Sequence, residues 1–558
     1  MKKKILALAL IFLLLLGGLV PVGSAASMPE QGEEAPTPDS GTVSPQAAVD
    51  RTGIADRIII SAFFPPCRED MGWGPMTFQP GSEIDDYHYR MMAECGVNFI
   101  ENVWSSQMQT REQNLHIAEL CDKYGMWLFV QEAWEWQPYW KDNHQPHHYL
   151  LDLTQSQLED YVNFWKDVPG VGGFFLYDEA GDDDRDPYSM KAYGELAAKI
   201  KKIAPDMIVH TSDAPNRSMA SVIDMISSAK NYEGLGHKLD HIGDCEYPFQ
   251  SGVNGEIKWT WYKYLDNYRK FGLEHGIKTS RYLQLNAGWD GPVAESRYKV
   301  MEKNQIRYEL YSGLAYGVKK FGLFSWNIPP VEQGAHWEGS ILNRDGSYTP
   351  MYDHLKDLLG QVHALSDVIF PLEARNVYST VDKRGGFLNL EKFTSKPPGT
   401  FFAQPGDSRD MLYSYMVNPA DGTRYLMVVN NATASNASPI THTIHFKTAS
   451  GLEVAGLTEV SHVDGNYMAP VDLRSTHSAT FTFDVGEGRL FRLDYEGEPG
   501  DPGTIGDSGL PNWLWWVIGF SGILAGLGVL GAIASAVFGA IVTGIAALGG
   551  LLLWLLNR

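Results

Sequence analysis

The chain has 558 residues, of which 44% are hydrophobic, and it carries a formal net charge of −22 at pH 7. This length leaves room for more than one domain and for a large core. The acidic balance argues against a nucleic-acid partner, because phosphate binding requires clustered Lys and Arg.

The N-terminus has the pattern of a secretory signal peptide. It begins MKKK, continues through an apolar stretch from Ile5 to Leu16, and reaches small residues at Ser24, Ala25 and Ala26. The pattern predicts a signal peptide over residues 1–26 that is cut near Ala26. Residues 27–50 are rich in Pro, Glu, Ser and Gly, which is typical of a flexible linker.

The four cysteines are Cys67, Cys95, Cys121 and Cys245. Their spacing matches no metal motif. Although a secreted chain could form a disulfide, we expect buried free thiols.

Residues 51–369 alternate between strand-like and helix-like segments. The helix-like segments include those that begin at Asp85, Arg111, Thr154, Ser189 and Met351. Eight strands with a helix after each predict an α/β fold, the (β/α)₈ TIM barrel. A doubly wound parallel sheet is the structural alternative. The eight candidate strands begin at Arg57, Val97, Met126, Gly172, Met207, Leu239, Ser280 and Lys319.

The pattern changes after the barrel. Short alternating runs within residues 370–495, such as RYLMVVNN from Arg424 and GRLFRLDY from Gly488, predict an antiparallel β-sandwich. Residues 496–511 form a second Gly- and Pro-rich linker. Within residues 512–558, the stretch from Trp513 to Leu556 is uncharged and longer than one bilayer crossing, so it predicts a transmembrane anchor as a tilted helix or a hairpin. These features predict a secreted, membrane-anchored protein on the extracellular face of the cell envelope.

The sequence GVGGFFLYDEAG, residues 170–181, ends a buried strand at Asp178 and Glu179. Because sites in parallel barrels lie at the carboxyl ends of the strands, the polar residues there are the candidates. They combine carboxylates, amides and indoles with few basic residues, which suits a neutral, polyhydroxylated ligand such as a sugar. The other candidates at these ends are Glu132, Trp134, Glu246, Gln284, Asn286, Trp289, Asp290 and Trp326.

Hydrolysis of a glycoside needs one carboxylic acid to protonate the leaving oxygen and a second carboxylate to attack or to activate water. Glu179 is the predicted proton donor. In the structural alternative, Asp178 and Glu179 cap the following helix. The acidic run at residues 182–186 is more typical of a solvated loop than of a calcium site, and we expect no metal and no cofactor.

These motifs resemble the retaining glycoside hydrolases of the (β/α)₈ superfamily that includes cellulases and β-galactosidases. The resemblance implies that Glu179, at the end of strand four, is the acid/base. The segment FSWN, residues 324–327, is similar to the end of strand eight in this superfamily, where a Trp commonly follows a cis peptide and forms the floor of the sugar subsite. GEGRLFRL, residues 486–493, resembles the closing strand of the accessory β-domains.

Strand seven departs from this pattern. The family's nucleophile is a Glu at its end, whereas this chain has Gln284 and Asn286 in SRYLQLNAGWD. Either Glu246, Glu132 or Asp290 replaces the missing acid, or the protein binds glycan without cleaving it.

The sequence thus predicts a glycoside hydrolase that acts on an extracellular oligo- or polysaccharide. Glu179 would be its acid and Glu246 the leading second carboxylate, with Trp134, Trp289 and Trp326 as sugar platforms. Asp178, Gln284 and Asn286 would also bind substrate. The main alternative is a non-catalytic surface glycan-binding protein, and a weaker one is a structural envelope protein.

Overall fold

The structure is a computed structural model. The described residues from 49 onward lie in one compact unit. The structure describes residues 49–63, 65, 83–101, 111–130, 149–176, 190–213, 222, 225–228, 231, 239–249, 257, 259–285, 287–289, 301–326, 336–338, 341–343, 346–380, 391–392, 401–402, 409–433, 437–446 and 453–496.

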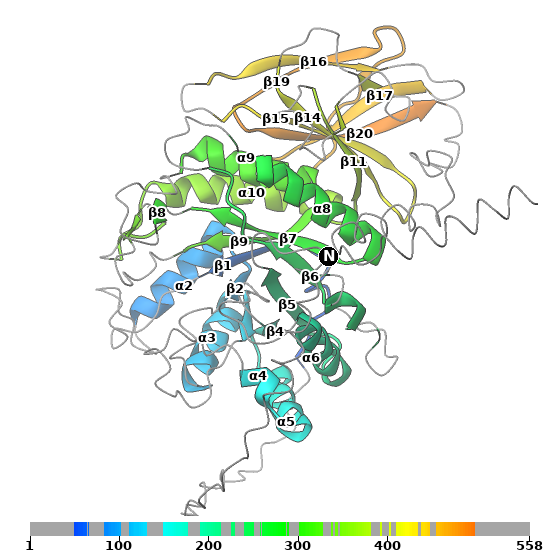
Figure 1. Cartoon of the computed structure of the whole chain (residues 1–558). Coiled ribbons are helices and arrows are strands. Elements are labelled where there is room, and N and C mark those ends of the chain that lie inside the picture. Colours follow the sequence, from blue (N-terminus) through cyan, green and yellow to red (C-terminus); the bar gives the residue numbers. More distant parts are fainter. Residues whose placement is uncertain are drawn as a thin grey trace, which may run out of the picture. The chain divides into compact units, whose positions relative to one another are not determined.

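Eight parallel strands form a closed barrel (Figure 1). The sheet closes because β1 pairs with both β2 and β9. This closure confirms the predicted (β/α)₈ barrel and excludes the doubly wound sheet, which is open. In order around the barrel, the strands are β1 (Ile59–Phe63), β2 (Phe99–Glu101), β3 (Trp127–Val130), β4 (Val171–Phe175), β5 (Ile208–Asp213), β6 (His241–Asp244), β7 (Lys278–Gln284) and β9 (Val318–Phe324).

Helices surround the strands (Figure 1). The five predicted helices are present, and α5 begins at a capping box in which Thr154 and Gln157 satisfy each other's backbone N–H groups. The helices are α2 (Glu83–Cys95), α3 (Arg111–Tyr124), α4 (Tyr149–Asp152), α5 (Gln155–Lys166), α6 (Met190–Ile203), α8 (Trp259–His275), α9 (Lys303–Ala315) and α10 (Met351–Ile369).

Two apolar regions hold the barrel together. One lies between the strands and the helices, and includes Trp165, Trp261 and Leu358. The other fills the lumen, because alternate residues of each strand point inward. The lumen cluster comprises Ile54, Ile59, Phe63, Phe99, Phe129, Phe175, Ile208 and Tyr282.

The second domain consists of a seven-stranded and a three-stranded antiparallel sheet, apart from one parallel edge pair, and confirms the predicted β-sandwich. The first sheet contains, in order, β12 (Glu391–Lys392), β11 (Glu373–Ser379), β14 (Met411–Val417), β15 (Arg424–Asn430), β20 (Gly488–Glu496), β17 (Glu453–Val460) and β18 (Val471–Asp472). The second contains β13 (Phe401–Phe402), β16 (Ile440–Phe446) and β19 (Ser478–Phe483).

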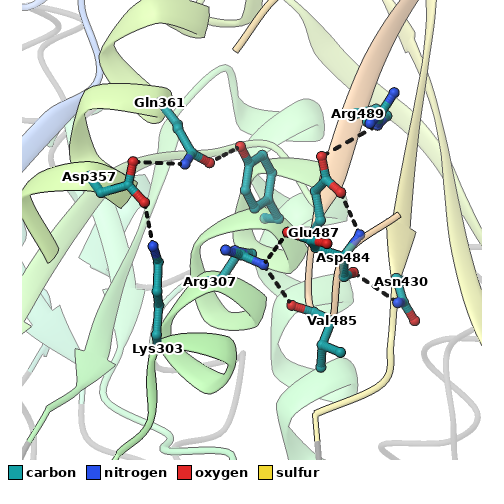
Figure 2. A network of polar contacts seen from close by, with 10 residues as sticks. Lys303, Arg307, Asp357, Gln361, Asn430, Asp484, Val485, Glu487 and Arg489 are labelled. Carbon is teal, nitrogen blue, oxygen red and sulfur yellow. Dashed lines mark hydrogen bonds and ion pairs between the residues drawn. The ribbon is translucent and has the colours of Figure 1, made fainter. Parts of the chain in front are cut away.

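The helix α9 packs directly on the sandwich (Figure 2). Arg307 donates to Val485 O at 3.3 Å and lies 3.4 Å from an Asp484 carboxylate oxygen. Gly486 has φ +73°, and a Cβ there would stand 2.4 Å from Asn304 O, so only glycine permits this approach. The same turn therefore fixes the sandwich against the barrel by charge and by close backbone contact.

A second set of polar contacts joins α9 to α10 beside this interface. Lys303 pairs with Asp357 at 2.5 Å, and the Gln361 amide donates to Asp357 at 3.3 Å. Tyr311 OH donates to Gln361 Oε1 at 2.9 Å. These bonds tie the two helices next to the sandwich to each other.

Two of the cysteines, Cys95 and Cys121, are free thiols, as expected. Cys95 and Cys121 are buried, and burial raises the pKa of each thiol. Cys245 is partly exposed, while Cys67 lies outside the described residues.

Among the residues that the structure describes, no helix is both long and apolar enough to cross a membrane. The predicted signal peptide and transmembrane anchor lie outside these residues, as do the two linkers except at residues 49, 50 and 496.

Candidate functional site

Strand four ends just before the predicted proton donor in the sequence. The strand β4 is buried throughout and ends at Phe175. Leu176 continues it, with its N–H bonded to His210 O on β5 at 2.8 Å. Asp178 and Glu179 follow Leu176 within three residues and lie outside the described residues. The strand that precedes them in the sequence thus ends at the carboxyl edge of the barrel, and their catalytic role stays a prediction.

The end of strand six holds two buried carboxylates. Asp244 forms an ion pair with Arg281 and accepts the Glu246 N–H at 3.1 Å. Glu246 is only 8% exposed, and its carboxylate accepts a 2.5 Å hydrogen bond from Thr260, the second residue of α8. The leading candidate for the second carboxylate is thus bonded to the beginning of a helix. Its catalytic role stays a prediction.

Arg281, the partner of Asp244, belongs to β7 and is buried. Its guanidinium stands 4.6 Å from the ring centroid of Trp261 on α8, a cation–π contact. Burial lowers the pKa of Arg281 to about 9, an effect that the nearby Glu309 opposes. Arg281 thereby joins β6 and β7 to the layer of helices.

Gln284, at the end of strand seven, is engaged on both its backbone and its side chain. It is 1% exposed, and its N–H donates to Glu309 on α9 at 2.7 Å. Its side-chain oxygen accepts the Phe249 N–H at 3.3 Å. Burial raises the pKa of Glu309, while the Gln284 N–H and Arg281 lower it. Gln284 therefore connects strand seven to α9 through its backbone N–H, and to the segment after strand six through the side-chain amide that replaces the expected acid.

The end of strand eight shows the expected cis peptide. The bond between Phe324 and Ser325 is cis, and Trp326 follows, with its N–H bonded to Phe63 O at 2.9 Å. Trp326 is completely buried, with Tyr348 and Tyr352 at centroid distances of 6.3 and 6.4 Å. A sugar could reach this indole only if neighbouring segments moved. Its role as a platform stays a prediction.

The segments that follow strands seven and eight pair with each other. The strand β8 (Ala287–Trp289) is antiparallel to β10 (His336–Glu338), with Glu338 opposite Ala287 and His336 opposite Trp289. This pairing brings a His-Trp-Glu segment beside the continuation of strand seven. The sequence analysis did not identify β10, although its polar and aromatic residues were a visible signal. Glu132, Trp134, Asn286 and Asp290 lie outside the described residues.

A polar network occupies the barrel lumen and was also not identified from the sequence. Glu101 and Lys320, both completely buried, form an ion pair. Ser61 donates to Glu101 at 3.0 Å and Tyr282 donates to it at 2.7 Å. His210 lies 3.7 Å from the same carboxylate, and burial together with Lys320 keeps its pKa well below the usual value.

Aromatic side chains of neighbouring strand ends pack beside Tyr282, a member of this network. The Phe63 ring lies 5.4 Å from that of Tyr282 and 5.6 Å from that of Phe324, measured between centroids. Tyr247 in turn contacts Phe324 at 5.4 Å. Because Glu101 is fully enclosed and paired, it acts as a structural charge in the lumen.

Within the described ranges, no group of three His, Cys, Asp or Glu side chains is arranged to hold a metal ion.

No family model and no curated protein matches the chain. Solved structures similar to it include a β-galactosidase from the haloarchaeon Halorubrum lacusprofundi (13% identity, 55% of this chain, 58% of that chain, TM-score 0.38). Two others are an endoxylanase from Clostridium papyrosolvens (10% identity, 78% of this chain, 97% of that chain, TM-score 0.36) and an α-L-arabinofuranosidase from Thermotoga maritima (10% identity, 79% of this chain, 97% of that chain, TM-score 0.39).

The chain spans a little over half of that β-galactosidase. These similarities are too low to assign a substrate or a site residue. The (β/α)₈ barrel is established by its own strand pairing, and the similar solved structures are glycoside hydrolases.

Proposed function

We propose that the protein is a glycoside hydrolase with Glu179 as its general acid. The supporting observation is that β4 belongs to a closed parallel barrel and ends at Phe175, just before Asp178 and Glu179. In such barrels the carboxyl ends of the strands carry the active site. The acid would protonate the leaving glycosidic oxygen, and a second carboxylate would stabilise or attack the anomeric carbon.

The substrate in this proposal is an extracellular oligo- or polysaccharide. Trp134 and Trp289 would provide faces for sugar rings, while Asp178 and Asn286 would bind hydroxyl groups. The signal-peptide pattern of residues 1–26 and the uncharged segment within residues 512–558 support secretion and tethering to the outer face of a membrane.

The test is hydrolysis by the full chain and by its Glu179→Gln variant. Aryl glycosides of common hexoses and pentoses, in both anomeric forms, and polysaccharides would serve as substrates. We expect Glu179→Gln to lower kcat/KM roughly 10²–10⁴-fold, the usual contribution of a general acid. The loss should shrink for dinitrophenyl glycosides, whose leaving group departs without a proton. Equal kcat/KM for both proteins would refute the assignment.

A matched control is Glu274→Gln. Glu274 is 71% exposed and lies at the end of α8 that precedes β7, on the opposite edge of the barrel from the site. The same charge is removed, and the activity should be unchanged.

A non-catalytic glycan-binding protein is the alternative, and one observation favours it. Gln284 stands where the family has its nucleophile, and an amide cannot form a glycosyl ester at a useful rate. The side-chain amide of Gln284 accepts the Phe249 N–H and its backbone N–H donates to Glu309, which is consistent with a structural role for Gln284 at the strand end. Affinity for a glycan without release of reducing ends, over the whole substrate panel, would establish this alternative.

A further inference from the structure

Two aromatic side chains at the carboxyl edge of the barrel remain partly exposed. Phe324 is the last residue of β9, and Tyr247 follows the end of β6 by three residues. Their ring centroids lie 5.4 Å apart, and the ring planes differ by 32°. The other strand-ending residues of the barrel whose burial the structure describes are buried, namely Phe63, Glu101, Val130, Phe175, Asp244 and Gln284. Phe324 and Tyr247 thus present aromatic surface where the strand ends around them are closed.

This aromatic pair rests on the packed lumen of the barrel. Both side chains pack against the lumen cluster. The Phe324 ring lies 5.6 Å from that of Phe63, which in turn lies 5.4 Å from that of Tyr282, measured between centroids. Phe63 and Tyr282 are each only 2% exposed. Because a close-packed interior has no room for a further ring, the pair cannot turn inward and its exposed surface is a fixed feature of this edge.

The segment that carries Tyr247 is held on both sides of it. Glu246, the residue before it, is hydrogen-bonded through both its backbone N–H and its carboxylate. Phe249, two residues after it, is completely buried and donates its N–H to the Gln284 side chain at 3.3 Å. Pro248 follows Tyr247 directly and restricts the backbone of Tyr247 to extended conformations. Little conformational entropy is therefore lost when a ligand covers the Tyr247 ring.

We propose that Tyr247 and Phe324 form the aromatic floor of a saccharide-binding site, an inference that rests on the carbohydrate ligand of the proposed function. Rigid aromatic rings at the carboxyl edge of a barrel suit the apolar face of a sugar ring, with polar groups around them to bind its hydroxyls. Trp326 is completely buried, so it offers no such face in this structure. The floor is formed instead by the residue that ends β9 and by the segment that Gln284 holds in place.

The experiment measures the binding of cellohexaose, xylohexaose and laminarihexaose to the full chain by titration calorimetry. These probes contain no aryl group, so an aromatic leaving group cannot contribute to the affinity. For the saccharide that binds most tightly, we expect Tyr247→Ala to weaken binding roughly 10–100-fold, because the covered ring is lost. Phe324→Leu keeps apolar volume against Phe63 but has no flat ring, and it should weaken binding about 2–10-fold.

Two further variants separate stacking from other causes. Tyr247→Phe keeps the ring and should recover most of the affinity that Tyr247→Ala loses. Tyr467→Leu is the matched control with unchanged affinity, because Tyr467 is a 46% exposed tyrosine between β17 and β18 of the second domain. Far-UV circular dichroism of each variant would show that it is folded.

The outcomes separate this floor from the hydrolase function. Unchanged affinity in Tyr247→Ala, an equal loss in Tyr247→Phe, or a loss that accompanies unfolding rejects the floor. It is also rejected if the unmodified chain binds none of the three saccharides. Release of reducing ends is measured in the same samples. Affinity that depends on both rings without such release supports the floor and argues against hydrolysis, whereas release with unchanged affinity in both ring variants supports hydrolysis and rejects the floor.

Discussion

Replacing Lys320 by Met should destabilise the barrel strongly. Lys320 and Glu101 are both completely buried, and the variant would leave Glu101 with hydrogen bonds from Ser61 and Tyr282 but without a counter-charge. Removal of one partner from a buried ion pair typically costs about 3–5 kcal/mol. This cost is a large part of the 5–15 kcal/mol by which an ordinary domain is stable. Urea denaturation followed by tryptophan fluorescence would measure it.

A double variant tests whether the uncompensated charge is the cause. In Lys320→Met with Glu101→Gln the lumen contains no charge from this pair, and the amide oxygen can still accept hydrogen bonds. We expect a free energy of unfolding within about 1 kcal/mol of the unmodified chain. Lys319→Met is the matched control, because the neighbouring Lys319 is also buried but its ammonium group donates to the backbone carbonyls of Ile369 and Leu372. A loss below about 1 kcal/mol in Lys320→Met, or no recovery in the double variant, would refute the reasoning.

Three further outcomes follow from described contacts. Gly486→Ala should make the sandwich more susceptible to limited proteolysis than Gly422→Ala, because both have positive φ but only the first would place a Cβ against backbone. Burial keeps the pKa values of His210 and His241 well below the usual value, so below about pH 6.5 only the unfolded state gains these protons. The free energy of unfolding should therefore fall by about 1.4 kcal/mol per histidine between pH 7.5 and pH 5.5, and the urea midpoint should fall with it. Unchanged midpoints would contradict this. Cys95, whose pKa is raised by burial, should resist iodoacetamide in the folded protein and react in urea, as read by peptide mapping.

The barrel was predictable because its strands are buried on both faces. Such strands are continuous apolar runs, as in the GGFF segment that forms most of β4, and each is followed by a helix. The helix α9 is different because it is buried along its whole length from Gln305 to Ala315, between the barrel and the sandwich. Its polar residues are therefore internal, and the usual alternation of apolar and polar faces is lost.

The site was less predictable because its arrangement depends on distant partners. Glu101 ends β2, but only the structure shows that it is paired with Lys320 on the eighth barrel strand. Similarly, β10 is three residues long and is defined by its pairing with β8. Neither partner can be inferred from local composition. What the sequence could provide was the position of Asp178 and Glu179 relative to strand four.

The contacts of α9 connect the second domain to the end of strand seven. On this helix, Arg307 bonds the sandwich turn at Val485, and two residues later Glu309 accepts the N–H of Gln284 at the end of strand seven. A helix held by hydrogen bonds along its axis transmits a displacement at one turn to the next, since close-packed interiors deform little. The sandwich therefore restricts the same helix that positions the end of β7, from which β8 and its paired segment β10 extend.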